Sequence, residues 1–447
     1  MTNMTKHKKE EAPSPESVYH TLASADADLA SSGGALYRWT NGYWAAQDVA
    51  REESRAFSWL QAHYPSKTTP PIAKRCVEAA VMGAQELPRA KSRDIILPLL
   101  NGYLHVDMKT GELRLEAPDK AAGLTYMLNA SFDQDADAPV FHEFLEQIFT
   151  LDDETQGWVQ EFVGYTLIHD CRHQLAMFLV GSGANGKTTF TEIIAALHKK
   201  VVGMQLDRLD GFKLSPLIDA SLVVVDETPQ RINEQQLKTL ISGGLSQFDI
   251  KYRNPVSFRP SAKWIILGNA VPAISDQSHG FWRRMPIVPF RRQFSTAKQD
   301  PNLARKIIDH EISGVLLWAL TGLIRLIQRG RFPEPSEAML VTQIECQRES
   351  NSVLAWWSDG RVELNLAIET PRSLIYADYK QWCTDNGMLA LGVEKFWVRL
   401  KAIAGDEAVD AKPRKIQRQV VRVVPLLLLN NADLKTNGKI VAGRFGQ

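Results

Sequence analysis

One short stretch limits the folds open to this chain more than any other: Gly181-Ser-Gly-Ala-Asn-Gly-Lys-Thr188. It fits the pattern G-x-x-x-x-G-K-[ST] of a phosphate-binding loop, or P-loop. The apolar run 174–180 before it suits a buried strand, and residues 190–197 after it have helical spacing. Strand, loop and helix in this order predict an α/β fold organised around the loop.

Each residue type of the loop has a chemical reason. Glycines let the backbone wrap closely around phosphate groups, and the loop N–H groups and the helix N-terminus face the negative charge. We expect Lys187 to reach the β and γ phosphates of ATP, and the Thr188 hydroxyl to hold Mg²⁺. The predicted ATP-binding residues of the loop are Gly181, Ser182, Gly183, Ala184, Asn185, Gly186, Lys187, Thr188 and Thr189.

A second strand with acids at its end follows the loop. Residues 220–227 are a run of β-branched residues that ends in Asp226 and Glu227, as in a buried parallel strand with carboxylates at its C-terminal end. This is the expected form of a Walker B element. Asp226 would hold Mg²⁺, and Glu227 would polarise the attacking water. An acid after an apolar strand is common, so the element depends on the loop upstream.

Three further features follow in order. The segment 248–260 is predicted to be a hairpin whose tip carries Lys251, Tyr252 and Arg253, residue types that stack on bases and contact phosphates; an ordinary solvated hairpin is the alternative. The strand 264–267 ends near Asn269, which could orient a water near the γ-phosphate. Arg283 and Arg284 precede another strand. They could form a surface ion pair or reach a neighbouring subunit's nucleotide.

The order of these motifs resembles superfamily 3 helicases, and within them the phage, plasmid and poxvirus primase-helicases. The resemblance covers residues 94–290 most strongly. It implies a modified AAA+ ATPase that assembles into a ring, expected to be a hexamer, and moves along single-stranded DNA. It implies that Asn269 is a sensor, that the hairpin tip contacts DNA, and that Arg284, or Arg283 beside it, is an arginine finger.

Two departures from the family pattern stand out. The family usually has an acid after the Gly-Gly pair before the hairpin, whereas Gly244 is followed by Leu245 here. Many relatives carry an N-terminal primase domain, but the residues before position 94 hold neither a zinc-ligand cluster nor evident paired carboxylates. We therefore expect a helicase that works with a separate primase or polymerase.

Composition sets the broad class. The chain has 447 residues, a formal net charge of +1 and four widely spaced cysteines, so neither a global basic field nor a disulfide or zinc framework is indicated. The N-terminus lacks the apolar core of a signal peptide, and the apolar stretch 312–324 is too short to span a bilayer. We expect a cytoplasmic protein that does not enter a membrane.

The expected fold class is α/β: a P-loop, AAA+-like ATPase domain with an N-terminal α+β region and a C-terminal winged-helix-like domain. The expected parts are a disordered tail at 1–17, the N-terminal region at 18–150, the ATPase domain at 151–330 and the C-terminal domain at 331–447. The last part has a basic cluster, which suits either phosphate contact or a solvated face. Its members are Lys395, Arg399, Lys401, Lys412, Arg414, Lys415, Arg418 and Arg422.

Two functions compete. The first is an ATP-dependent DNA helicase that unwinds the replicating DNA of a phage, plasmid or other mobile element, acting on single-stranded and forked DNA. The second is an origin-binding initiator that uses ATP only as a switch and does not unwind. Glu227, Asn269 and Arg284 favour the first, because a switch needs no complete hydrolytic set.

Overall fold

The computed structural model describes residues 13–89, 95–229, 232–248, 256–272, 274, 279–295, 297, 299–416 and 419–429. The chain divides into two compact units. The first runs up to Pro229 and includes Gln235–Asn269 and Arg283–Met339, and the second contains the chain from Leu340 together with two short segments, 230–234 and 270–282. Each unit is described by itself below.

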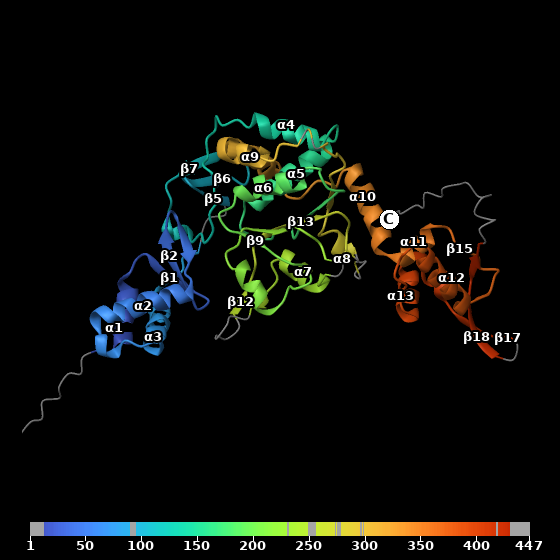
Figure 1. Cartoon of the computed structure of the whole chain (residues 1–447), viewed down its shortest axis with the longest axis horizontal. Coiled ribbons are helices and arrows are strands. Elements are labelled where there is room, and N and C mark those ends of the chain that lie inside the picture. Colours follow the sequence, from blue (N-terminus) through green and yellow to red (C-terminus); the bar gives the residue numbers. More distant parts are fainter. Residues whose placement is uncertain are drawn as a thin grey trace, which may run out of the picture. The chain divides into compact units, whose positions relative to one another are not determined.

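The first unit begins with helices that pack together beside a small sheet of strand order β3-β2-β1-β4 (Figure 1). Asn41 and Gly42 both have positive φ at the turn between β2 and β3, as a two-residue type I′ hairpin turn requires. The helix α1 begins at Pro15, so the last three residues of the expected disordered tail are helical. The elements are α1 (Pro15–Ala25), β1 (Leu29–Ser32), β2 (Ala35–Thr40), β3 (Tyr43–Ala46), α2 (Val49–His63), η1 (Pro65–Lys67), α3 (Pro70–Gly83) and β4 (Gln85–Glu86).

A three-stranded antiparallel meander and two helices lead to the predicted loop. Apolar residues alternate in these strands, so one face of the meander is buried in the main core. Its elements and the helices after it are β5 (Ile95–Leu99), β6 (Gly102–Val106), β7 (Leu113–Glu116), η2 (Lys120–Ala122), α4 (Pro139–Ile148) and α5 (Asp153–Thr166).

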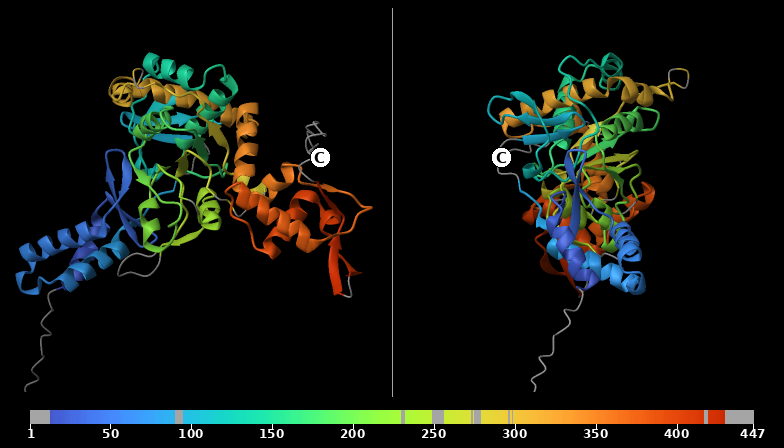
Figure 2. Two further views of the ribbon diagram at one scale, coloured as in Figure 1. Left: turned by 45° about the vertical axis from the view of Figure 1, so that its right-hand side comes forward. Right: turned by 90° about the vertical axis from the view of Figure 1, so that its left-hand side faces the viewer.

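A five-stranded sheet of order β14-β8-β13-β10-β9 forms the centre of the first unit, and every neighbouring pair is parallel. Apart from β9 at the edge of the sheet, whose first and last residues are exposed, its strands are short, mostly buried apolar runs, as in parallel sheets covered on both faces. Helices α5, α6 and α9 lie on one side of these strands and α7 on the other (Figures 1 and 2). The elements are β8 (Met177–Val180), α6 (Lys187–Ala196), β9 (Val201–Gly203), η3 (Gly211–Leu217), β10 (Leu222–Val225), α7 (Glu234–Ile241), β11 (Ser246–Phe248), β12 (Val256–Phe258), β13 (Lys263–Gly268), α8 (His279–Trp282) and β14 (Ile287–Pro289).

The helix α9 (Leu303–Arg329) is the longest described element, with 27 residues. By length and composition alone it could cross a membrane; the apolar stretch recognised in the sequence is only its central part. Core helices pass the same test, and α9 packs against α4, α5 and α6. Near its start, Glu311 accepts hydrogen bonds from the Val140 and Phe141 N–H groups at 3.1 and 2.9 Å. These bonds cap α4, whose own N-cap residue supplies none.

The other end of α9 is fixed to α5 by a buried ion cluster. The Glu161 carboxylate is 3 % exposed and accepts hydrogen bonds from Arg329 at 2.6 and 2.8 Å and from Arg325 at 3.3 Å. The expected domain boundary at residue 330 stays a prediction. The first unit extends to Met339, because Phe332 packs on Trp158 and Ser336 bonds Thr155.

The second unit has its own core around Trp356, Tyr379, Phe396 and Trp397. Three helices surround a three-stranded antiparallel sheet of order β16-β18-β17, and β15 pairs with β19. The elements are α10 (Glu337–Ser350, which begins in the first unit), α11 (Ser352–Ser358), β15 (Val362–Leu364), β16 (Thr370–Pro371), α12 (Arg372–Asp385), α13 (Val393–Ala404), α14 (Asp406–Val409), β17 (Lys412–Ile416), β18 (Gln419–Val424) and β19 (Leu426–Leu428).

Candidate functional site

The glycine-rich loop connects β8 to α6 and has a backbone that few residues can adopt. Gly183, Ala184 and Gly186 all have positive φ, at 66°, 48° and 88°, a region that favours glycine. A Cβ on Gly181 would lie 2.3 Å from the Asn185 amide nitrogen and from the Phe290 carbonyl oxygen. The first glycine is therefore required by close packing, and the last by its dihedral angle.

Lys187 lies at the centre of the loop. Its side chain is buried, and its ammonium donates to the Gly181 carbonyl oxygen at 2.6 Å and to Asn185 Oδ1 at 3.0 Å. Burial lowers the pKa of this amine. Both acceptors are neutral, and within the described residues no carboxylate pairs with it. The loop therefore holds a positive charge that an anion can neutralise.

The N-terminus of α6 faces the same space. Gly186 is its N-cap residue and, having no side chain, makes no cap hydrogen bond. The first N–H groups of a helix lack partners within the helix, and together with the helix dipole they form an anion-binding site. Thr188, in the first turn, is exposed, so its hydroxyl is accessible to a ligand.

Polar residues follow the next two strands of the sheet after β8, which are β13 and β10. Asp226 and Glu227 follow β10, Asn269 follows β13, and all three are exposed. The register pairs Val225 with Ile266, and Gly268 with Val180. Continuing the β13–β8 register by one residue places Asn269 beside Gly181. Continuing the β10–β13 register by two residues places Glu227 opposite Gly268, on the other side of β13 from β8. The predicted phosphate, metal and water-activating groups thus share the carboxyl edge of the sheet.

The order of the strands also identifies this edge as a position for ligand binding. The chain leaves β8 toward β9, at one end of the sheet, and leaves β13 toward β14, at the other end. Adjacent strands whose connections run in opposite directions across the sheet make a topological switch point, where open α/β sheets bind ligands. The glycine-rich loop lies at this point.

Arg284 lies at the opposite edge. It precedes β14, its carbonyl accepts a hydrogen bond from the Ala176 N–H before β8, and its guanidinium donates to Ser242 and Gln174 at 2.9 and 3.2 Å. Burial, and secondarily Arg283, lower its pKa. The four residues of β8 separate the two edges by about 13 Å. Arg284 therefore does not face the loop of its own chain, and Arg283 beside it is exposed.

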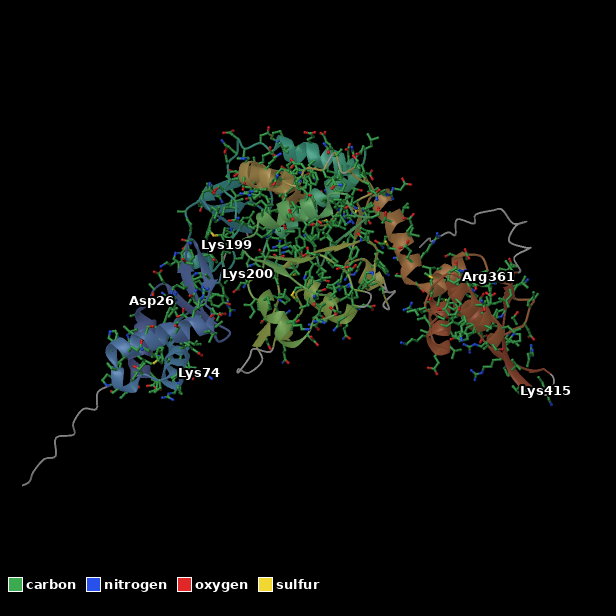
Figure 3. All side chains as sticks on the ribbon, in the orientation of Figure 1. Asp26, Lys74, Lys199, Lys200, Arg361 and Lys415 are labelled. Carbon is green, nitrogen blue, oxygen red and sulfur yellow. The ribbon has the colours of Figure 1, made fainter. Side chains whose placement is uncertain are left out.

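The predicted hairpin has its two strands, β11 and β12, paired antiparallel with Phe248 opposite Val256. Its tip, with Lys251, Tyr252 and Arg253, lies outside the described residues, so the DNA contact remains a prediction. In the second unit, Lys415 lies at the end of the β17–β18 hairpin (Figure 3). Arg414 is held by Glu369 at 2.5 to 2.8 Å and is less available for phosphate contact.

One residue that supports the glycine-rich loop was not predicted from the sequence. Gln293, after β14, donates to the Ser182 carbonyl and hydroxyl oxygens at 3.1 and 2.7 Å, and the Phe294 N–H donates to the Ala184 carbonyl at 2.8 Å. These contacts join positions 111 and 110 residues apart. No local pattern signals them.

Comparisons with known proteins match two parts of the chain. Residues 24–150 match the family described as D5 N terminal like. Residues 179–284, which contain the loop, Asp226, Glu227, Asn269 and Arg284, match a family of unknown function, DUF5906.

One curated relative is a protein of Acanthamoeba polyphaga mimivirus named "Putative helicase L207/L206". It is 25% identical over 242 residues, which cover 50% of this chain and 24% of the viral protein. The chain thus spans about a quarter of that relative's length. The sequence likenesses support a relation to viral helicase-like proteins.

Solved structures of the C-terminal region of NrS-1 are also similar to this chain. Two apo forms are 12% and 11% identical, cover 92% of this chain and 99% of their own, and give TM-scores of 0.47 and 0.49.

Proposed function

We propose that this protein is an ATP-dependent DNA helicase of superfamily 3 that unwinds duplex DNA during replication of a phage, plasmid or other mobile element. The observation that carries the proposal is the glycine-rich loop at the switch point of a parallel sheet, with the buried Lys187 ammonium held only by neutral acceptors. Nucleoside triphosphate phosphates are the anions that such a loop and helix N-terminus bind.

The residues present fit ATP and Mg²⁺. Gly181 packs too closely against Asn185 and Phe290 to carry a Cβ, which keeps the loop backbone in place, and Thr188 and Asp226 are exposed oxygen donors at the same edge of the sheet. Among the described residues, no three His, Cys, Asp or Glu side chains gather as a metal cage. Mg²⁺ needs none, because it is bound by one or two protein oxygens together with substrate phosphates and water. Bound Mg²⁺ would neutralise charge on the phosphates.

Hydrolysis would use the residues that end the neighbouring strands. Lys187 would leave the Gly181 carbonyl for the β and γ phosphates. Glu227, as general base, would polarise a water for attack on the γ-phosphate, and Asn269 would orient it. The exposure of Glu227 and Asn269 leaves both side chains accessible to water and nucleotide.

The position of Arg284 supports a ring. Because it lies about 13 Å from the loop edge of its own sheet, it can serve as an arginine finger only for a neighbouring subunit. Arg283 is the alternative finger. The resemblance to ring helicases, expected to be hexamers, suggests that the hairpin tip with Lys251, Tyr252 and Arg253 contacts single-stranded DNA.

The second unit favours an alternative function. Its helices α11, α12 and α13 and its sheet order β16-β18-β17 follow the order of elements in a winged helix. On α13, Lys395 is exposed, which suits phosphate contact, and the exposed Lys401 pairs with Asp406 at 3.2 Å. An initiator that binds origin DNA with this unit, and uses ATP only to switch its assembly, would need no Glu227.

Strand displacement separates the two functions. The full chain is incubated with forked DNA, ATP and Mg²⁺, beside the variant Glu227→Gln. A helicase releases the displaced strand only with a hydrolysable nucleotide, and the variant does not. If both proteins bind forked DNA and ATP but neither displaces a strand, the initiator function is supported and the helicase is refuted.

A further inference from the structure

The chain that leaves β14 folds against the glycine-rich loop. Residues 290–294, here called the β14 extension, contact the loop at three positions. The Phe290 carbonyl accepts from the Asn185 amide at 3.1 Å, Gln293 donates to Ser182, and the Phe294 N–H donates to Ala184. The proposed function gives this segment no role.

The strand order fixes which end of a nucleotide would face this segment. Asn269 and Glu227, the groups suited to the γ-phosphate, end β13 and β10 on one side of β8, whereas β14 lies on the other side. A nucleotide whose terminal phosphate points toward β13 and β10 must extend its ribose and base away from them. The base end then faces the β14 extension.

A fixed guanidinium lies on this side. Arg292 donates from Nη1 to the Gln147 carbonyl oxygen at 3.1 Å and to the Thr150 hydroxyl at 3.2 Å, so it bridges the β14 extension to the α4–α5 loop. Its guanidinium carbon lies 5.3 Å from the centre of the Phe294 ring. Arg292 is nevertheless exposed, so a ligand can reach it.

An exposed apolar residue directly follows Thr150, the residue that Arg292 bonds. Leu151, the residue after Thr150, is 98% exposed and has a φ of 58°, a region that leucine rarely adopts. The Leu151 side chain does not pack into a core, and leucine is not a residue type that suits this positive φ. Guanidinium planes and aromatic rings stack on nucleic bases, and an apolar neighbour excludes water from such a contact.

We propose that Arg292, Phe294 and Leu151 form the nucleobase subsite, in which a purine stacks on the Arg292–Phe294 pair and packs against Leu151. The inference rests on the proposed nucleotide binding at the loop. It adds a site for the base, which is the part of the nucleotide that the loop does not bind. The larger ring of a purine gains more stacking contact than a pyrimidine.

The test compares two ligands that share phosphates and differ in the base. Calorimetry measures the binding of a non-hydrolysable ATP analogue and of inorganic tripolyphosphate, both with Mg²⁺, to the full chain. The variants are Arg292→Gln, which removes the planar cation, and Leu151→Asn, which removes the apolar contact and suits the positive φ. The matched controls are Arg305→Gln, an exposed arginine of α9, and Leu115→Ser, an exposed leucine of β7.

Each subsite variant is expected to weaken the ATP analogue about tenfold, within the five- to hundredfold range of one stacking contact, and to leave tripolyphosphate binding unchanged. The controls should bind both ligands as the wild type does. Unchanged affinity for the analogue in both variants, or an equal loss for both ligands, would overturn the subsite while leaving nucleotide binding intact. A wild-type chain that binds neither ligand would overturn the proposed function and the subsite with it.

Discussion

Asp219 gives the sharpest test of the fold that supports the site. Its side chain is 7% exposed, one carboxylate oxygen has no hydrogen-bond partner among the described residues, and its φ is 57°. Burial raises the pKa of this carboxyl from 3.8 to about 6, against the opposing effects of Lys200 and a Thr125 hydrogen bond. We predict that Asp219→Asn makes the protein more stable at pH 8 than the wild type.

The direction of this stability change follows from the linkage between proton binding and folding. A carboxyl whose pKa is higher in the folded protein binds its proton more tightly there, so the folded state loses stability as the pH rises from about 4 through about 6. A difference of about two pH units corresponds to about 3 kcal/mol. The variant's amide nitrogen replaces an unpartnered oxygen at a cost of about 1–2 kcal/mol. The net gain expected at pH 8 is therefore about 1–2 kcal/mol, and it should disappear or reverse near pH 4.5.

Urea unfolding of both proteins at pH 4.5 and pH 8 measures this directly. The decisive quantity is the change in the stability difference between the two pH values, about 2 kcal/mol, because the unfolded carboxyl is already mostly ionised at pH 4.5. Burial lowers the pKa of His198 to about 3 in both proteins, so its contribution to the pH dependence of stability cancels from this difference. The control is Asp210→Asn, an exposed carboxylate nearby, which should show no such change. A stability difference that is the same at both pH values would refute the reasoning.

Three further predictions concern the proposed function. Lys187→Ala should weaken ATP binding and abolish turnover, whereas Glu227→Gln should bind ATP largely as the wild type does and fail to hydrolyse it; fluorescence binding and phosphate release distinguish them. Lys251→Ala with Arg253→Ala should weaken single-stranded DNA binding and reduce its salt slope by about 1.4, because each phosphate contact contributes about 0.7; an unchanged slope in titrations at several salt concentrations would move the DNA site elsewhere. Arg284→Ala should lose about 10³-fold or more in ATPase rate and regain activity when mixed with Lys187→Ala subunits, which still carry the finger; no recovery in mixed oligomers would exclude Arg284.

The central sheet and its loop were predictable because their signals are local. The runs that form β8, β10 and β13 are continuously apolar, and only a strand buried on both faces needs that pattern. The polar residues that end them had to share an edge once the strands were parallel. The Asn41-Gly42 turn is similarly local, since two consecutive positive φ angles suit few other residues.

The contacts that stabilise the site were not predictable from the same patterns. The Gln293–Ser182 bond, the Glu311 cap on α4 and the Arg292–Thr150 bond join residues 111, 171 and 142 positions apart. Each is made by a polar side chain whose type would equally suit a solvated surface. Only the folded topology brings these partners together.

The helix α9 has a consequence for the loop between α4 and α5. At one end its Glu311 caps α4, and 18 residues later, about 27 Å along the helix, Arg329 is bonded to Glu161 of α5. One rigid rod therefore sets the spacing of the two helices that carry the 149–152 loop, and with it Thr150 and Leu151. The conformational entropy of that loop is lost when the protein folds rather than when a ligand arrives, so a ligand meets a preorganised surface. Substitutions at the far end of α9 should change ligand affinity without touching the ligand.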